Sequence, residues 1–237
     1  EVVLGLSARD AVENARIYLE RERAIKGQPC PLGTDHLALV RLVARGTPAA
    51  MAQAFELLLA ANALPEVTGR LCAEVFEETI CQNRKGERVS LRAIERFLAE
   101  HYTGTCTKFR VANLVRVPAS ARVPAPKVAV IGSGPAGLCA AWGLMRAGYG
   151  VTVFDSASCL GGTLGYAQAG FELPRQALDA VVRRFQSAGI EFITDFLFGR
   201  AATPADLFEE GFGAVLITTG IGVAATFGIP GENAGGV

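Results

Sequence analysis

A glycine-rich turn near the middle of the chain carries the clearest chemistry. It follows the apolar run VAVI and reads Gly132-Ser133-Gly134-Pro135-Ala136-Gly137. Between a strand and a helix, Gly132 permits the tight turn, Gly134 lets the backbone approach a pyrophosphate, and Gly137 lets the helix pack against the strand. The helix that begins there presents free backbone N–H groups to phosphate charge. The turn therefore predicts a site for the diphosphate of a dinucleotide.

A carboxylate follows the turn at the spacing that a dinucleotide site requires. Asp155 comes 23 positions after Gly132 and ends a second apolar run, where it can accept hydrogen bonds from a ribose diol. The glycine pattern alone is a weak signal, but the turn and the acid together predict dinucleotide binding. The alternative is a glycine-rich turn in an α/β protein that binds no nucleotide.

Two later stretches bear on which dinucleotide is bound. Gly161 and Gly162, followed by Thr163, come after a gap of five residues behind the acid. A second close backbone approach at that point suits the flavin side of an extended FAD molecule. Thr219 and Gly220 follow a later apolar run and again allow close passage of a cofactor. We therefore favour FAD over NAD and add these residues to the expected cofactor-binding set.

The elements that must position these residues form a βαβ unit. From Lys127 the chain has the pattern of a short strand, the glycine-rich turn, a helix that ends near Gly148, and a second strand that ends at Asp155. A further helix over PRQALDAVVRRFQSAG leads to the candidate strands IEFIT and AVLITTG. Such a unit implies a parallel sheet.

The first half of the chain has a different period. Residues 8 to about 116 carry helical periodicity without strand alternation. The stretch VPASARVPAPK then supplies three prolines, which deny helix and strand interiors a donor and indicate a linker. We expect an α/β protein with an all-helical domain at 1–116, a Pro-rich linker at 117–126 and a Rossmann-like FAD-binding domain at 127–237.

Charge and cysteine content narrow the classes of partner. The chain has 23 Lys and Arg residues and 23 Asp and Glu residues, so no basic field draws in nucleic acid. Six cysteines fall short of a disulfide scaffold and fit a reducing cytoplasm. We expect no targeting signal and no membrane span. The missing initial Met and the ending GENAGGV indicate a fragment of a longer protein.

Several segments of the chain, and the order in which they occur, resemble those of the small subunit of glutamate synthase and of the amino-terminal half of dihydropyrimidine dehydrogenase. These segments are LPEVTGRLC, VSLRAIERF, KVAVIGSGPAGL, FDSASCLGGTLGYAQAGFELPRQAL and FGIPGEN, and the resemblance runs from about Arg9 to Val237. It implies a helical domain of the type that carries two four-iron clusters, followed by an FAD domain. It also implies that an inserted NADPH domain would begin where this chain ends, so that the FAD domain is truncated.

Most of the cysteines that the resemblance would make cluster ligands are absent. The first ligand run, RIYLERERAIKGQPCP, keeps only Cys30. In the second ligand loop only Cys72 stands at a ligand position, and Cys81 falls one residue away from another. A four-iron cluster ordinarily needs four thiolates, and the spacing of these cysteines and Cys106 includes no Cys-x-x-Cys pair. We therefore predict no iron–sulphur cluster and no other metal.

A charge near the glycine pair also departs from the family. The family has a basic residue in Phe-basic-Leu-Pro, where this chain has Glu172, which cannot neutralise a pyrophosphate. Arg175 comes three residues later and is the candidate replacement, the alternative being a solvated charge at the start of a helix. We assign no catalytic role to His36, His101 or Cys159, so the catalytic residues stay unknown.

These features favour an FAD-binding electron-transfer subunit or fragment of an NAD(P)H-dependent oxidoreductase. Hydride would pass from NAD(P)H to the flavin, and electrons would leave to a partner protein or subunit, while the chain holds and tunes the cofactor. The alternative is a non-catalytic dinucleotide-binding assembly subunit of a larger oxidoreductase complex, with catalysis on a partner chain.

Overall fold

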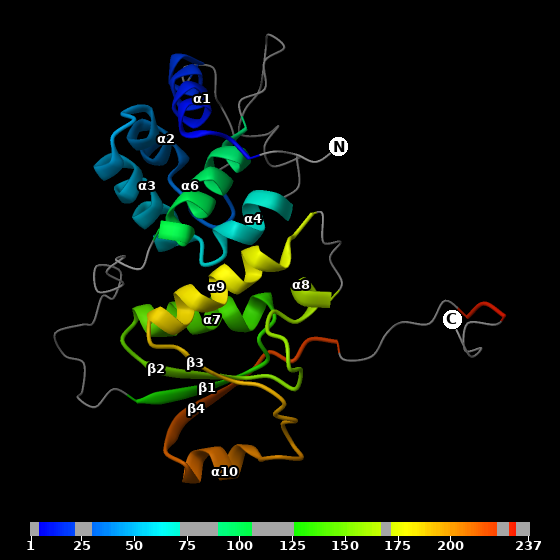
Figure 1. Ribbon diagram of the computed structural model, residues 1–237. Coiled ribbons are helices and arrows are strands. Elements are labelled where there is room, and N and C mark those ends of the chain that lie inside the picture. Colours follow the sequence, from blue (N-terminus) through cyan, green and yellow to red (C-terminus); the bar gives the residue numbers. More distant parts are fainter. Residues whose placement is uncertain are drawn as a thin grey trace.

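The chain folds into a layer of helices set against an α/β unit (Figure 1). The computed structural model describes residues 5–21, 30–71, 90–105, 126–166, 172–221 and 228–230. The helical part comprises α1 to α4 and α6, and the α/β part extends from β1 to β4. The predicted boundary at 116 and the predicted linker up to residue 125 lie outside the described residues. The predicted fold class, a helical part followed by a Rossmann-like sheet, is confirmed.

The five described helices of the helical part pack on one another around a shared apolar core. Its elements are α1 (Ala8–Arg21), α2 (His36–Ala44), α3 (Pro48–Ala61), α4 (Pro65–Leu71) and α6 (Leu91–Thr105). In α3, Phe55 and Leu58 are fully buried. The hydroxyl of Thr47 accepts a hydrogen bond from the N–H of Ala50, and Pro48 needs no donor at the first helical position. No helix of the described residues is both long and apolar enough to cross a membrane.

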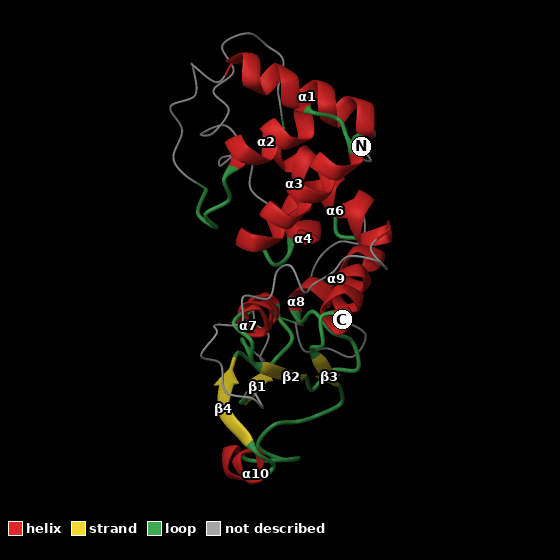
Figure 2. Ribbon diagram, turned by 90° about the vertical axis from the view of Figure 1, so that its left-hand side faces the viewer, coloured by secondary structure: helices red, strands yellow, loops and turns green. Residues whose placement is uncertain are grey.

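The α/β part is a parallel four-stranded sheet with helices on both faces (Figure 2). In chain order its elements are β1 (Lys127–Ile131), α7 (Pro135–Arg146), β2 (Gly150–Phe154), α8 (Thr163–Tyr166), α9 (Arg175–Ser187), β3 (Glu191–Ile193), α10 (Pro204–Glu209) and β4 (Phe212–Ile217). The strand order is β3-β2-β1-β4, and each neighbouring pair runs parallel. The parallel sheet that the βαβ pattern predicted is therefore present.

Different helices cover the two faces of the sheet. Val130 of β1 and Val153 of β2 share a buried cluster with α7, α9 and the helical part. Ala129 and Ile131 of β1 point the other way and pack with Leu207 of α10. This alternation follows from the period of two in a strand, which sends successive side chains to opposite faces. Figure 2 shows α10 on one side of the sheet, with α7 and α9 on the other.

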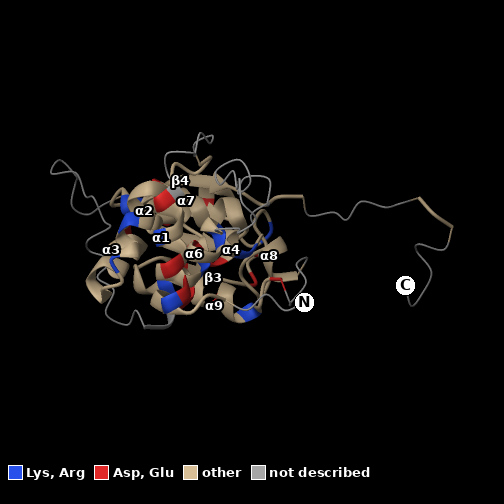
Figure 3. Ribbon diagram, turned by 90° about the horizontal axis from the view of Figure 1, so that it is seen from above, with Lys and Arg blue, Asp and Glu red and all other residues tan. Residues whose placement is uncertain are grey.

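Charges on the helical part are mixed in sign. Figure 3 shows Lys and Arg residues interspersed with Asp and Glu residues over these helices. Within α6, Nε of Arg96 lies 2.8 Å from Oε1 of Glu100, and Arg70 of α4 contacts the same carboxylate. The more exposed pair of Arg96 and Glu100 contributes only about 0–1 kcal/mol. The stability of this part must therefore come mainly from its apolar core.

The two parts join where α3 ends against α7. Nε1 of Trp142 in α7 donates to the carbonyl oxygen of Leu59 at 3.2 Å, and the guanidinium of Arg146 donates to the carbonyl oxygen of Ala60. Both carbonyl groups belong to the last turn of α3, where carbonyl groups have no N–H partner within the helix. Side chains of the α/β part thus complete the hydrogen bonding of a helix in the helical part.

A buried ion pair lies at the centre of this join. Nη2 of Arg184 in α9 is 2.8 Å from Oε2 of Glu66 in α4, and the two side chains are 5% and 2% exposed. The same Nη2 donates to the carbonyl oxygen of Ala63 at 2.9 Å. The guanidinium also lies 4.9 Å from the ring centroid of Trp142, which stacks on Phe185. Because buried charges need both a counter-charge and hydrogen bonds, this cluster fixes how α9 meets α4.

We predict that Arg184→Met lowers the free energy of unfolding by about 3–5 kcal/mol, because it takes the counter-charge away from a buried carboxylate. The double variant Glu66→Leu/Arg184→Met should recover most of that loss, since both charges leave together. Urea unfolding followed by circular dichroism measures both values. A loss below about 1 kcal/mol in the single variant would contradict the role given to the pair.

Candidate functional site

The turn between β1 and α7 has close contacts at its two outer glycines. Gly132 has a φ of +107°, and a Cβ on it would lie 2.6 Å from the carbonyl oxygen of Thr218. A Cβ on Gly137 would lie 1.9 Å from the carbonyl oxygen of Gly132. Gly134 caps α7, and no described atom comes within 4 Å of the position of its missing Cβ. The turn is therefore tight at both ends and open in the middle, where a ligand could approach the backbone.

Ser133 ties this turn to the end of β2 and to the second glycine pair. Its backbone N–H and its hydroxyl donate to Oδ2 of Asp155, at 2.7 and 2.5 Å. Its hydroxyl oxygen accepts from the N–H of Gly161 at 2.9 Å. Oδ1 of Asp155 accepts from the N–H of Ala157 at 2.9 Å. Three hydrogen bonds thus orient the carboxylate beside the turn, a role for Ser133 that its place in the motif did not reveal.

The second glycine pair lies directly against the first glycine-rich turn. A Cβ on Gly162 would be 2.9 Å from Cα of Gly134. Gly161 has a φ of +111°, and a Cβ on it would meet the side chain of Leu178 in α9 at 2.3 Å. Thr163 follows as the first residue of α8 and is exposed. The structure thus brings together two glycine stretches that the sequence analysis selected separately.

The chain leaves β4 beside the same turn. The N–H of Thr218 donates to the carbonyl oxygen of Ile131 at 2.7 Å. Its hydroxyl lies 2.9 and 3.1 Å from the carbonyl oxygens of Ile131 and Gly132. Thr219 and Gly220 come next and are exposed. Sequence reasoning selected Thr219 and missed Thr218, because two adjacent threonines after a strand give no sign of which one packs on the turn.

The charged residues near the glycine pair take different positions. Glu172 is exposed. Nη1 of Arg175 lies 3.3 Å from where a Cβ on Gly165 would be, so the guanidinium reaches the α8 segment that follows the glycine pair. Its Nε donates to Oδ1 of Asp179 at 3.0 Å. An open depression of about 270 Å³ lies alongside, lined in part by Arg175, Asp179 and Arg183. A contact between Arg175 and a phosphate stays a prediction.

Two protein families match successive parts of the chain. Residues 1–106 match the family described as dihydropyrimidine dehydrogenase domain II, 4Fe-4S cluster. Residues 130–189 match the NAD(P)-binding Rossmann-like domain. The second match includes the glycine-rich turn, Asp155 and the second glycine pair, which supports a dinucleotide as the kind of ligand.

Curated relatives align with most or all of this chain, but the chain spans only 36–42% of their length. The glutamate synthase [NADPH] small chain of Bacillus subtilis (strain 168) is 32% identical over 185 residues, 78% of this chain and 36% of that protein. The glutamate synthase [NADPH] small chain of Azospirillum brasilense is 30% identical over 209 residues, 88% of this chain and 42% of that protein. UacF of Escherichia coli (strain K12), for which only an oxidoreductase class is suggested, is 33% identical over 240 residues, 100% of this chain and 36% of that protein. The chain is a distant homologue of the glutamate synthase small chain.

The cysteines of the part that matches the four-iron-cluster domain differ from the ligand set that such a cluster needs. Cys30 is a half-buried free cysteine, whereas Cys72, Cys81 and Cys106 lie outside the described residues. No group of three or more His, Cys, Asp or Glu side chains within the described ranges is placed to hold a metal ion. Among the described residues, Cys30 is the one cysteine at a ligand position, and a four-iron cluster ordinarily needs four. The absence of a cluster stays a prediction.

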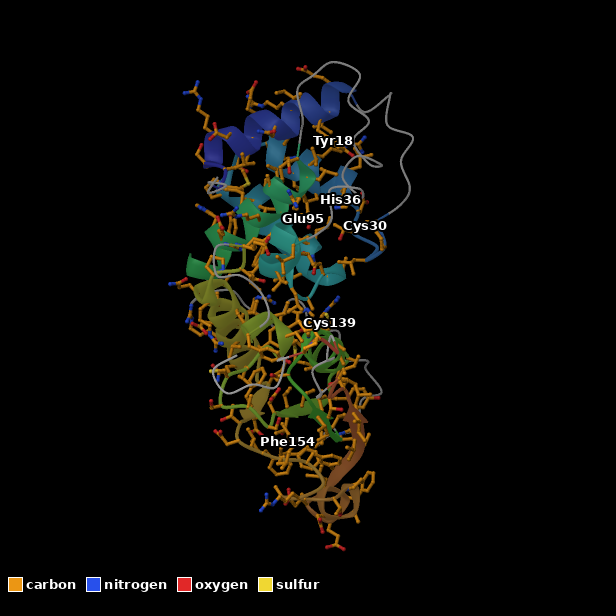
Figure 4. The ribbon with its side chains drawn as sticks, turned by 90° about the vertical axis from the view of Figure 1, so that its right-hand side faces the viewer. Tyr18, Cys30, His36, Glu95, Cys139 and Phe154 are labelled. Atoms are coloured by element: carbon orange, nitrogen blue, oxygen red, sulfur yellow. The ribbon has the colours of Figure 1, made fainter. Side chains whose placement is uncertain are left out.

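The histidines of this homologue take part in packing. Nε2 of His36, the first residue of α2, is 2.8 Å from Oε1 of Glu95 in α6, and their side chains are 12% and 11% exposed. Figure 4 shows this pair on the side of the helical part where Cys30 lies. His101 stacks on Phe97, with ring centroids 5.4 Å apart. His36 thereby joins the start of α2 to α6.

We predict that Gly137→Ala lowers the free energy of unfolding by about 1–3 kcal/mol or more, because the backbone of the turn must move to admit the methyl group. Gly143→Ala is the matched control, since it lies in the same helix with no described atom within 4 Å of the new Cβ. That variant should be more stable than the wild type by about 0.5–1 kcal/mol. Urea unfolding compares the two, and equal effects would contradict the tight turn.

Proposed function

We propose that this chain is an FAD-binding electron-transfer subunit or fragment of an NAD(P)H-dependent oxidoreductase. The observation that carries the proposal is the contact between the glycine-rich turn and the second glycine pair, with Asp155 held beside them by Ser133. The glycines let the two segments approach each other closely, and the open position at Gly134 leaves room for a diphosphate. The N-terminus of α7 would face the diphosphate, and Asp155 would accept hydrogen bonds from the ribose.

FAD is favoured over NAD at this site, and NAD is the alternative. A Rossmann turn with its acid suits either molecule, because both contain adenosine diphosphate. The second glycine pair lies against the first turn, and Thr219 and Gly220 are exposed beside it, so the candidate surface extends beyond the turn and the acid, which suits the larger cofactor. Bound FAD would supply hydride acceptance and electron transfer, while the chain binds and orients it.

A larger protein is the proposed electron acceptor. Relatives of this chain are named as the small chain of glutamate synthase [NADPH], which supports a large-subunit partner and NAD(P)H as the source of hydride. We propose no side chain of this chain as an acid or a base. A non-catalytic assembly subunit is the second candidate, and the loss of most cluster cysteines favours it, because electrons would lack the family's route through the helical part.

An absorption spectrum with iron analysis on the same sample tests the cofactor. We expect the bands of oxidised flavin without iron. Stoichiometric iron with a broad absorbance would contradict the predicted loss of the clusters. A colourless chain that takes up neither FAD nor NAD in a titration would contradict the proposed function. Bound flavin that an added reductant such as dithionite cannot reduce would favour the assembly subunit.

We predict that Gly134→Ala weakens FAD binding by about tenfold or more while leaving the melting temperature unchanged. The φ of −63° at this position suits alanine, and no described atom lies within 4 Å of the added methyl group. The methyl group would stand where the backbone should meet the diphosphate. Flavin fluorescence titration measures the dissociation constant, with Gly143→Ala as the control in the same helix. An unchanged value in Gly134→Ala would place the diphosphate elsewhere.

A further inference from the structure

The helix that forms the first half of the candidate site is held by the helical part. α7 begins at the glycine-rich turn, and its second half carries Trp142 and Arg146, which donate to the carbonyl oxygens of Leu59 and Ala60 in α3. Figure 1 shows α7 and α9 lying between the sheet and the helices of the helical part. One end of α7 therefore faces the dinucleotide site, and the other is hydrogen-bonded to α3.

α9 links the second half of the site to the helical part in the same way. Its Leu178 fills the space beside Gly161, within 2.3 Å of where a Cβ would stand. Further along the helix, Arg184 forms the buried ion pair with Glu66 and donates to the carbonyl oxygen of Ala63. The second glycine pair, like the first glycine-rich turn, therefore rests on a helix that the helical part holds.

Trp142 couples these two helices to each other. Its ring stacks on Phe185 of α9 with centroids 4.9 Å apart, and the side chain is 2% exposed. Apolar contacts have no preferred direction, whereas a hydrogen bond depends on direction as well as distance. A displaced α7 would leave the buried indole N–H without its acceptor at Leu59, which is unfavourable. Trp142 therefore fixes α7 relative to both α3 and α9.

We propose that Trp142 and Arg184 are positioning residues, through which the helical part sets the placement of the two glycine stretches of the dinucleotide site. The inference rests on the proposed function, because it needs a dinucleotide at that site. It gives the helical part a role that requires no iron–sulphur cluster. This coupling is reciprocal. If contact with the helical part raises dinucleotide affinity by a given factor, a bound dinucleotide stabilises that contact by the same factor.

Trp142→Phe is the sharpest test of this inference. Phenylalanine keeps an aromatic ring against Phe185 but removes the N–H that the Leu59 carbonyl accepts. We expect the dissociation constant for FAD to rise about three- to tenfold, the range of one hydrogen bond, at a temperature where circular dichroism shows the variant folded. Val43→Ala is the matched control, because Val43 is fully buried in α2, which packs on α1 and α3. It should lower stability and leave FAD affinity unchanged.

Hydrogen exchange supplies the reciprocal measurement. FAD should slow amide exchange in α3 and α4 of the wild-type chain, and slow it less in Trp142→Phe, although neither helix forms the glycine stretches. If Trp142→Phe does not fold, Arg146→Met removes the other α7 donor to α3 at a more exposed position. That variant is expected to change affinity and exchange in the same direction.

The possible outcomes separate this inference from the proposed function. An unchanged dissociation constant in folded Trp142→Phe, with FAD leaving exchange in α3 and α4 unaltered, would overturn the positioning role and leave the proposed function standing. Equal weakening in Val43→Ala and Trp142→Phe would show general destabilisation and would also overturn it. A wild-type chain that binds no FAD would overturn both.

Discussion

The last turn of α3 ends in carbonyl groups that its own helix cannot satisfy, and the arrangement of the chain follows from how they are met. Trp142 and Arg146 of α7 supply donors to that turn, and Arg184 of α9 supplies one just beyond it. These donors stand on two different helices. Their hydrogen bonds at the end of α3 therefore fix the positions of both α7 and α9. The buried pair of Arg184 and Glu66 adds the requirement that two opposite charges face each other. One apolar cluster consequently runs through both parts.

The local geometry of the candidate site could be predicted from the sequence. The positive φ at Gly132 and the contact between Gly137 and the carbonyl group of Gly132 arise within a few residues. Short apolar runs indicate strands and a 3.6-residue period indicates helices, and the parallel sheet and α9 follow from these patterns. The position of Asp155 follows from the end of β2, since it comes directly after that strand. These features arise within the α/β part and do not depend on how the helical part docks on it.

The contacts between distant segments could not be predicted in this way. Trp142 and its acceptor Leu59 are 83 residues apart, and Arg184 and Glu66 are 118 apart. In the sequence, Arg184 is one of several cations on an amphipathic helix, and nothing local marks it as buried. Its burial depends on a carboxylate that only the docking of the two parts brings near. Thr218 was missed for the same reason, because its partners lie on another strand.

The join between the two parts also limits what such a chain can lose during evolution. None of the contacts described for the join involves a cysteine side chain. Deleting the helices would expose the stacked rings of Trp142 and Phe185 to water and strip Arg184 of its carboxylate. Exposed aromatic surface of that kind promotes aggregation. The predicted loss of the cluster ligands is therefore separable from loss of the helical domain, whose described contacts with the α/β part need no metal.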